Sequence, residues 1–550
     1  MSLWSTIVYR LKEIIQKMIG ARTIEQTLHV APVISSQMEE AIQTWSMMYK
    51  GQAPWVHEPT YGDKTRVVSL GLPAMIASEK ARTALLEMQS EITTPVKEVE
   101  VNNPLYKEPE PDEFGNLIPS VEPKTIKQQQ PVGNTARAEY LESQYKKLKK
   151  QLRKQIEYGI AKGGLVIKPY VILNGDDENA DYTADIEYDF IQADAFYPMA
   201  FDASNRITEA AFIQTKTEKD AIYRRLEYHK WSGNVVEIIN RAFKSSNNTN
   251  QGDMSGVDLG EEVALSTIPE WKDTPERTVI KNVTRPLFAY FKMPEANTID
   301  TSSPLGVSGY SRAVSLIKDA DMQYSRLLWE YEAGEMAINV DRDAFKFMED
   351  PNGVEHSVLG NMQERLYRRI DIDSDGLFEP YAPTLRDLSY RDGLNTILMR
   401  IEDTCGISRG TLSDATQEAK TATELKILKQ RSYQTNADIQ QAIEDAVRDT
   451  IYIMDVYATL YEITPEGEYN VSFEWDDSII VDVDEELSKR ITLMQNGLAS
   501  KLENRMWYFG ETEQQALEAL QRIQQENLES AEQDLAMESN RINMSQNEEQ

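Results

Sequence analysis

The sequence is poor in the residues that build most metal and redox sites. Its 550 residues include one cysteine and four histidines. A single cysteine, Cys405, cannot form an intrachain disulfide, which fits a reducing compartment and excludes a cysteine-rich zinc framework. The histidines are widely spaced and none belongs to an HExxH-type motif, so we expect no histidine-based metal or catalytic centre. They are His29, His57, His229 and His356.

Recognisable catalytic motifs are also missing. The chain contains neither the phosphate-binding GxxxxGK[ST] motif nor the GxSxG motif of a nucleophilic serine. Carboxylates are abundant, but no pair stands out as the acid and base of a glycosidase. We therefore predict no catalytic site and no cofactor.

Long apolar runs are absent as well. No segment reaches the roughly eighteen apolar residues that a membrane span needs. Residues 1–20 form an amphipathic pattern, but Arg10 and Lys12 lie inside it, which is the wrong order for a signal peptide. This segment could lie on a membrane, but we expect it to pack against protein. The chain is expected to be soluble and cytosolic while it is made.

Positive charge is scarce relative to negative charge. The 90 acidic residues exceed the 58 lysines and arginines, which gives a net charge of −32. A protein that grips nucleic acid by neutralising phosphates has the opposite balance, so a sequence-specific DNA binder is not expected. A wall past which DNA slides would benefit from repelling phosphate, and the charge alone does not decide whether DNA is a partner.

Two amphipathic helices and a short loop dominate residues 389–460. Apolar residues recur at three- and four-residue steps from 394 to 401, and again from 422 to 460. Between them, Gly406 and Gly410 interrupt both patterns and predict a loop. A helix of about forty residues would be roughly 60 Å long. Periodicity by itself fits a coiled coil or helix bundle equally well.

This region resembles the core of tailed-bacteriophage portal proteins, in the branch found in phages of Gram-positive hosts. The resemblance rests on the string CGISRGTLS at residues 405–413, a short polar run, and then KTATELK at residues 420–426 on a long helix. It extends more weakly from about residue 45 to residue 519. It implies an α+β portal fold with a long helical core and stem, a β-rich wing, a small α/β clip and a helical C-terminal crown.

The resemblance also implies a domain order, which agrees with the several lobes expected for a chain of this length. The expected segments are N-terminal helices and the wing (1–302), the first stem helix (303–335), the clip (336–384), the second stem helix (385–406), the tunnel loop (407–421), a long core helix with a strand returning to the wing (422–482), the crown (483–535) and a frayed tail (536–550).

Local patterns predict several elements independently of the resemblance. Residues 1–95 are expected to be mostly helical, with one helix running from Pro73 to about Ile92. The proline-rich residues 94–134 predict a long outward-facing loop, and a helix is expected from Thr135. Residues 163–295 alternate as strands do.

The function implied by the resemblance is mechanical. About twelve copies would form a homo-oligomeric ring, a dodecamer, at the portal vertex of the virion capsid after assembly in the host cytoplasm. The ring would be the channel for packaging and ejecting double-stranded DNA without regard to sequence. It would bind the large terminase, then the head-tail adaptor, and also the major capsid and scaffolding proteins, but no membrane. The alternatives are a non-portal helical capsid scaffold or assembly protein, and an enzyme.

The tunnel loop is the candidate DNA contact in this scheme. Its hydroxyl groups would make weak, sequence-blind phosphate contacts, and its two cations would touch the DNA backbone transiently. Pairing of those cations with acids such as Asp414 or Glu418 across a subunit boundary is an equal alternative. The candidate residues are Ser408, Arg409, Thr411, Ser413 and Lys420.

One strongly basic cluster interrupts the acidic sequence. It comprises Lys146, Lys147, Lys149, Lys150, Arg153 and Lys154 on the helix from Thr135. A solvated face or a contact with acidic surface of a neighbouring subunit or of the capsid is the favoured interpretation, and a DNA contact is the alternative. Reversing the charges of Lys147 and Lys150 together is expected to weaken ring assembly.

The clip is the expected contact region for adaptor and terminase. Its candidate residues are Arg368, Arg369, Asp371, Asp373 and Asp375. The aspartates match the first half of a calcium-binding EF-hand loop, but Ala382 occupies the position of the required glutamate. We predict a turn between strands and no metal site, either here or in the acidic runs at 174–181 and 476–486.

Overall fold

The structure is a computed structural model that describes residues 23–59, 65–86, 88–102, 125–174, 183–218, 221–245, 259–341, 347–349, 355–357, 367–370, 378–414, 422–475, 483–496, 498–511, 515–523 and 525. The chain divides into two compact units, Met1–Glu474 and Trp475–Gln550, which we describe separately. The predicted N-terminal amphipathic helix (1–20) and frayed tail (536–550) lie outside the described residues.

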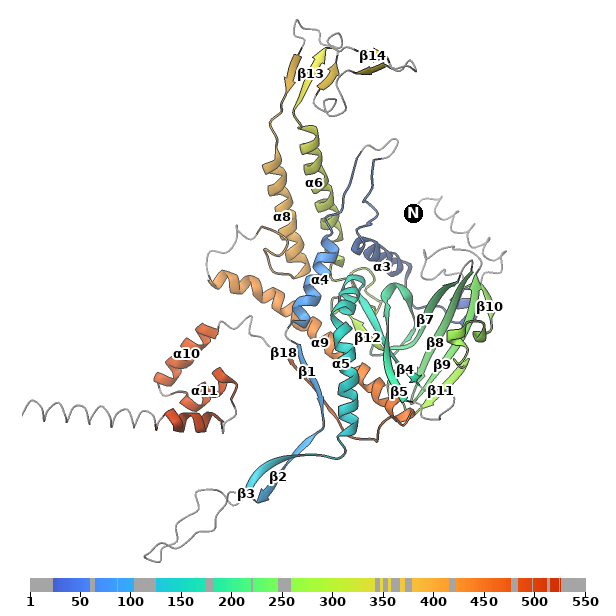
Figure 1. Cartoon of the computed structure of the whole chain (residues 1–550), viewed down its shortest axis with the longest axis vertical. Helices are drawn as coiled ribbons and strands as arrows, with labels where there is room; N and C mark the ends of the chain where they lie inside the picture. Colours follow the sequence, from blue (N-terminus) through green and yellow to red (C-terminus); the bar gives the residue numbers. More distant parts are fainter. Residues whose placement is uncertain are drawn as a thin grey trace, which may run out of the picture. The chain divides into compact units, whose positions relative to one another are not determined.

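Four helices make the packed centre of the first unit (Figure 1). They are α3 (Ser36–Tyr49), α4 (Leu72–Leu85), α5 (Ala136–Lys162) and α9 (Ala422–Leu460), and the short α2 (Ile24–Leu28) precedes them. The helices predicted from Thr135 and over 422–460 are thereby confirmed. On α5, Leu141, Leu148 and Leu152 recur on one face and are at most 1% exposed, because α4 and α9 pack against that face.

Two antiparallel sheets follow α5 and confirm the strands predicted for residues 163–295. The first has the order β12-β4-β5, and the second has the order β10-β9-β8-β7-β6, with β11 also pairing with β9. The strands are β4 (Gly164–Asn174), β5 (Thr183–Gln192), β6 (Phe196–Phe201), β7 (Ile207–Glu218), β8 (Ala221–Ser232), β9 (Val235–Ser245), β10 (Glu261–Val263), β11 (Arg277–Lys281) and β12 (Ala289–Lys292), with the 3-10 turns η1 (Ala193–Ala195), η2 (Leu265–Thr267) and η3 (Pro269–Trp271).

Aromatic side chains join these two sheets. Phe196 of β6 lies 5.5 Å, centroid to centroid, from Tyr290 of β12, and Phe212 of β7 lies 5.5 Å from Phe288. The three phenylalanines are buried and Tyr290 is partly buried. Aromatic pairs of this kind stabilise a core by more than the area they bury. The α+β class expected from the sequence is therefore confirmed, and aromatic side chains pack between its two sheets.

A pair of helices leaves this core and carries a cluster of strands (Figure 1). After η4 (Ser311–Ala313), α6 (Val314–Ala333) and α8 (Asp387–Cys405) pack side by side. Between them in sequence, β13 (Ala337–Asp341) is the centre of the sheet β16-β13-β17, formed with β16 (Tyr367–Ile370) and β17 (Phe378–Tyr381). A second small sheet pairs β14 (Phe347–Glu349) with β15 (Glu355–Ser357).

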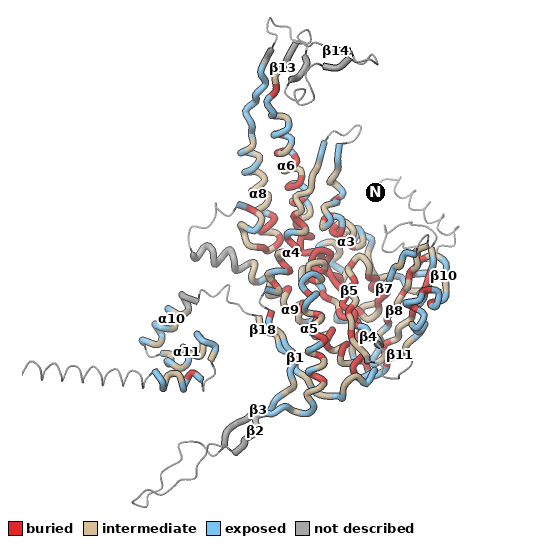
Figure 2. Tube along the Cα trace, in the orientation of Figure 1, coloured by how far each residue is buried: buried red, intermediate tan, exposed pale blue. Residues whose placement is uncertain are grey.

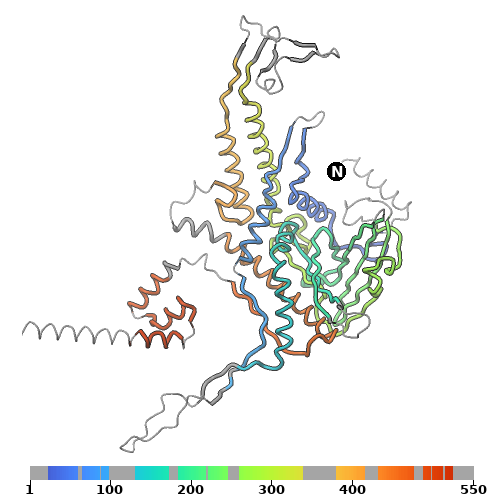
Figure 3. Tube along the Cα trace, viewed as in Figure 1, coloured from blue at the N-terminus to red at the C-terminus, as the bar shows by residue number. Residues whose placement is uncertain are grey.

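Three sequence-based expectations about strands were wrong. The helix expected to reach Ile92 ends at Leu85, and β1 (Met88–Thr93) follows. The long loop expected at 94–134 contains an antiparallel ribbon of β2 (Val96–Asn102) and β3 (Thr125–Pro131). The strand expected to return to the wing is β18 (Asn470–Trp475). It pairs with β1 (Figure 3), and in the described part of the chain it does not join the sheets of β4 and β9.

The physical reason is the same for β1 and β18. In β1, Met88 and Ile92 are buried and their neighbours exposed, a two-residue alternation that becomes favourable only when a partner strand is present. That partner lies almost four hundred residues away in the sequence. The short apolar pattern around Met88 and Ile92 is therefore ambiguous between helix and strand when it is read from the local sequence alone.

The second unit consists of helices. Its described elements are α10 (Val483–Gln495), α11 (Lys501–Phe509) and helical residues 515–523. Ser500 and Glu503 form a capping box at the start of α11, and Gly510 ends it in the left-handed conformation. Among the described residues of this unit only Ala516 is buried, while Leu498 is 75% exposed. The apolar residues described in this unit are therefore mostly not covered by one another.

Candidate functional site

The segment that follows α8 is a compact turn fixed to two helices. Gly406 ends α8 with φ at 67°, in the left-handed region where glycine is favoured. A Cβ atom at this position would lie 2.5 Å from Oγ1 of Thr435 on α9, so any side chain here would force Thr435 to shift. Ile407 is 7% exposed. The glycine thus sets a close approach between the turn and α9.

Glu402 organises this turn from within α8. Its side chain is fully buried, and Oε1 accepts hydrogen bonds from the backbone N–H groups of Leu412 (2.5 Å) and Ser413 (2.9 Å). Oε2 accepts a bond from the Ser413 hydroxyl at 2.7 Å. The main-chain carbonyl of Glu402 accepts two more, from Gly406 and Ile407. Sequence reasoning did not single out Glu402, because a glutamate on an amphipathic helix is ordinarily solvated.

The predicted loop residues have different surroundings in this turn. Arg409 forms a two-pronged ion pair with Asp403, at 3.1 and 2.9 Å, within the same chain. Ser413 is only 9% exposed and is bonded to Glu402. Thr411 is exposed, and its hydroxyl donates to the carbonyl of Ser408 at 2.6 Å. Lys420 lies outside the described residues.

The basic cluster lies on the outer side of α5. Lys146, Lys150, Arg153 and Lys154 are exposed and Lys149 is partly exposed. Lys147 instead contacts Asp185 of β5 at 2.6 Å, and Lys146 pairs with Glu142 at 3.4 Å. Within the part of the chain that the structure describes, no ion pair involves Lys149, Lys150 or Arg153. Lys147 is thus paired with an acid of the same chain, whereas most of the other cations of the cluster face solvent.

The predicted clip residues are only partly described. Arg368 and Arg369 belong to β16, which runs parallel to β13, whereas Asp371, Asp373 and Asp375 lie outside the described residues. The flanking strands β16 and β17 pair with opposite edges of β13. Among the residues that are described, no group of three or more histidine, cysteine or acidic side chains could hold a metal ion.

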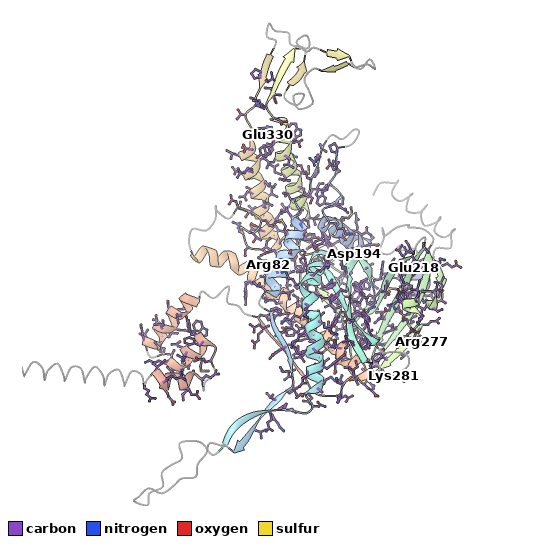
Figure 4. The ribbon with its side chains drawn as sticks, in the orientation of Figure 1. Arg82, Asp194, Glu218, Arg277, Lys281 and Glu330 are labelled. Carbon is purple, nitrogen blue, oxygen red and sulfur yellow. The ribbon has the colours of Figure 1, made fainter. Side chains whose placement is uncertain are left out.

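Two acidic side chains anchor α6, one to residues that precede α4 and the other to the start of α8. Asp321 of α6, 1% exposed, accepts bonds from Trp55 Nε1 (2.9 Å) and from the backbone of Leu70 (2.8 Å). Burial raises the pKa of this carboxyl. At the other end of α6, Glu330 accepts two guanidinium bonds from Arg386, at 3.1 and 2.7 Å (Figure 4). These bonds hold the pKa of Glu330 below its ordinary value.

The sheets enclose a second group of charges. A cavity of about 300 Å³ between β4–β5 and β7–β8 is lined by polar residues that include Lys168, Arg225 and Glu227. Burial opposes ionisation of Glu227, but the ammonium group of Lys168 at 2.9 Å and the neighbouring His229 hold its pKa well below the usual range. Burial lowers the pKa of His229. These charges compensate one another within the core.

Much of the helix pair and of the link from α6 to β13 is exposed or half-buried (Figure 2), and large apolar residues are among the exposed ones. Trp329 is 61% exposed, Met336 60% and Leu388 66%. On α8 only Ile401, Glu402 and Cys405 are buried, although the helix is amphipathic over its whole length. Burial raises the pKa of the Cys405 thiol to about 12, so this cysteine is a packing residue. None of the described helices is long and apolar enough to cross a membrane.

Exposed apolar residues such as Trp329 and Leu388 on α6 and α8 are typical of a surface that contacts another molecule. The family model "Phage portal protein, SPP1 Gp6-like" matches residues 121–533, and the chain belongs to this family. No curated protein matches the chain. Membership identifies a tailed-phage portal protein, which implies an oligomeric ring at the capsid vertex of a virion, partners in head assembly, and a structural role.

Proposed function

We propose that the chain forms a ring of about twelve subunits whose central channel passes double-stranded DNA during packaging and ejection. The observation that carries the proposal is the family match, which spans both long sheets, the helix pair and α9. In this scheme α6 and α8 are the stem, the strands between them are the clip that binds terminase and then adaptor, and α10 and α11 belong to the crown.

The uncovered helix faces support the ring. Trp329 and Leu388 lie on neighbouring helices and expose most of their side chains in a single subunit. In a closed ring each subunit presents one face to the neighbour on one side and a different face to the neighbour on the other. Contact between stem helices would remove this apolar surface from water, which is the dominant favourable term in protein association.

The DNA-facing element in this proposal is the segment 407–421. Thr411 is the most exposed of the predicted contacts that the structure describes, and Ser408 and Arg409 are partly exposed. Arg409 is already paired with Asp403, which reduces the charge it can offer to phosphate. A weakly charged contact surface fits DNA that must slide, because strong phosphate neutralisation would hold it in place.

The exposed cations of α5 are proposed to contact acidic surface on a neighbouring subunit or on the capsid. A net charge of −32 per chain, repeated around a ring, generates strong self-repulsion that such contacts would offset. Reversing the charges of Lys150 and Arg153 together should weaken ring assembly at physiological salt, and more strongly at low salt. Lys147→Glu is a poor test by itself, because it also breaks the internal pair with Asp185. Rings of unchanged stability in the Lys150 and Arg153 variant at physiological salt would refute this contact.

Electron microscopy combined with native mass measurement of the purified chain tests the main proposal. The expected result is a closed ring of about twelve subunits with a hole wide enough for duplex DNA. A monomer, a dimer or a rod would favour the non-portal scaffold alternative. Turnover assays would then decide between a scaffold and an enzyme.

A further inference from the structure

Glu402 holds the turn after α8 through hydrogen bonds to both ends of the turn. Residues 406–413 donate five hydrogen bonds to this one residue, two to its main-chain carbonyl and three to its carboxylate. The carboxylate accepts two successive backbone N–H groups, those of Leu412 and Ser413, as an anion does at the start of a helix. Hydrogen bonds to a charged acceptor are among the stronger ones in proteins.

Secondary contacts fix the turn on both sides of this carboxylate. The Ser413 hydroxyl accepts a bond from the backbone of Gly410 at 3.2 Å while it donates to Glu402. The backbone N–H of Asp414 donates to Oδ1 of Asn395 at 2.8 Å. Asn395 lies on α8, about two turns before Glu402. The chain therefore stays bound to α8 from Gly406 through Asp414.

We propose that Glu402 is a positioning residue for the tunnel loop, acting on its described residues 407–414. Its buried carboxylate fixes the turn 406–414 against α8 and so sets where Ser408, Arg409 and Thr411 lie relative to the proposed channel. Ser413 belongs to the same set of hydrogen bonds and is not a DNA contact. The part of this inference that concerns DNA rests on the proposed channel function, whereas the part that concerns the turn does not.

Amide hydrogen exchange in the assembled protein tests the turn directly. Glu402→Ala removes the acceptor of both backbone amides, so exchange at Leu412 and Ser413 should become at least roughly tenfold faster. Glu402→Gln keeps Oε1 as an acceptor, and its amide nitrogen can donate to the Ser413 hydroxyl. Protection in this variant should stay within about threefold of the wild type.

Two further variants keep the test informative if Glu402→Ala does not assemble. Ser413→Ala removes the two hydrogen bonds of the Ser413 hydroxyl, to Glu402 and from Gly410, but keeps the carboxylate, and should accelerate exchange at these amides about two- to tenfold. Asp392→Ala, which removes an exposed carboxylate from the same helix, should leave them unchanged. Unchanged exchange in both Glu402→Ala and Ser413→Ala would overturn the inference.

DNA retention in filled particles separates this inference from the proposed function. If Glu402 positions a channel loop, Glu402→Ala particles should lose packaged DNA more often than Glu402→Gln particles, although both rings assemble. Faster exchange together with wild-type packaging and retention would leave the role of Glu402 in the turn intact. It would refute the assignment of the turn to the DNA channel.

Discussion

Two amphipathic helices of the same chain have different surroundings. On α5, 12 of 27 residues are buried, among them Tyr145, Leu148 and Leu152. On α8, 3 of 19 residues are buried, and all three lie in its last turn and a half. The sequence patterns are similar, with apolar residues at three- and four-residue steps. The difference is that α5 is covered by α4, α9 and β4, whereas α8 packs mainly on α6.

The comparison shows that an amphipathic pattern predicts a partner but does not say which molecule supplies it. For α5 the partner is the rest of the same chain. For α8 the described part of the chain covers only one side, and Leu388 stays 66% exposed. In the ring proposed above, the missing partner of α8 would be the next copy. Stability of the subunit and stability of the assembly should therefore depend on different helices.

Leucine truncation on the two helices should give the largest difference. Leu152→Ala removes a side chain that is 1% exposed, so the free energy of unfolding should fall by about 3–5 kcal/mol in urea denaturation. Leu388→Ala should leave the unfolding of the isolated subunit unchanged, because its side chain is already solvated. Equal destabilisation by both would show that α8 is covered within one chain.

The same pair gives the opposite result for assembly. Leu388→Asp should shift ring formation, measured by native mass, to a concentration at least about tenfold higher, since burying an unpaired charge at a subunit contact is unfavourable. Trp329→Asp on the facing helix should behave alike. Rings that form as readily as the wild type would place the subunit contact elsewhere.

Two arginine clamps sharpen the comparison with a smaller effect. Arg137, 1% exposed, donates to the main-chain carbonyls of Asp455, Thr464 and Pro465 at the end of α9. Arg137→Met should lower the free energy of unfolding by about 2–3 kcal/mol, because these carbonyls lose a charged donor. Arg386→Met breaks the clamp between α6 and α8, but its side chain is 66% exposed, so the loss should be clearly smaller.

Acidification should give the smallest effect. Bonds from Arg386 lower the pKa of Glu330 in the folded protein. The stabilisation is therefore complete above the ordinary glutamate pKa and is lost as pH falls through the lower, folded-state value. In limited proteolysis of the α6–α8 end, Glu330→Gln should be cut faster than the wild type at neutral pH and equally fast in strong acid. A difference that persists at low pH would contradict this ionic origin.

Elements with a long, regular pattern could be predicted from the sequence. The period of Ile443, Val447 and Ile451 predicts α9 almost to the residue, and alternation predicts the strands after α5. The ribbon β2–β3 was missed because prolines and charges dominate its surroundings, and β1 because its partner lies in β18. Such pairings depend on tertiary contacts that no local window contains.

The loop after α8 could be predicted, but the way it is held could not. Gly406 and Gly410 mark the break in the helical pattern. Neither the burial of Glu402 nor the inward position of Ser413 has a signal in the sequence, because a glutamate and a serine in such a stretch are ordinarily exposed. For Arg409 the sequence left a DNA contact and an ion pair across a subunit boundary as equal alternatives, and the structure provides a partner, Asp403, within the chain.

The pairing of β1 with β18 has a consequence for synthesis on the ribosome. The edge of β1 is complete only after residue 475 has emerged, so nearly four hundred residues are translated while that edge lacks its neighbour. An open strand edge is a site for pairing with other chains, and contacts this distant in sequence form slowly. The nascent chain therefore has an interval in which its first strand needs protection, and a chain terminated before Asn470 would keep that edge permanently.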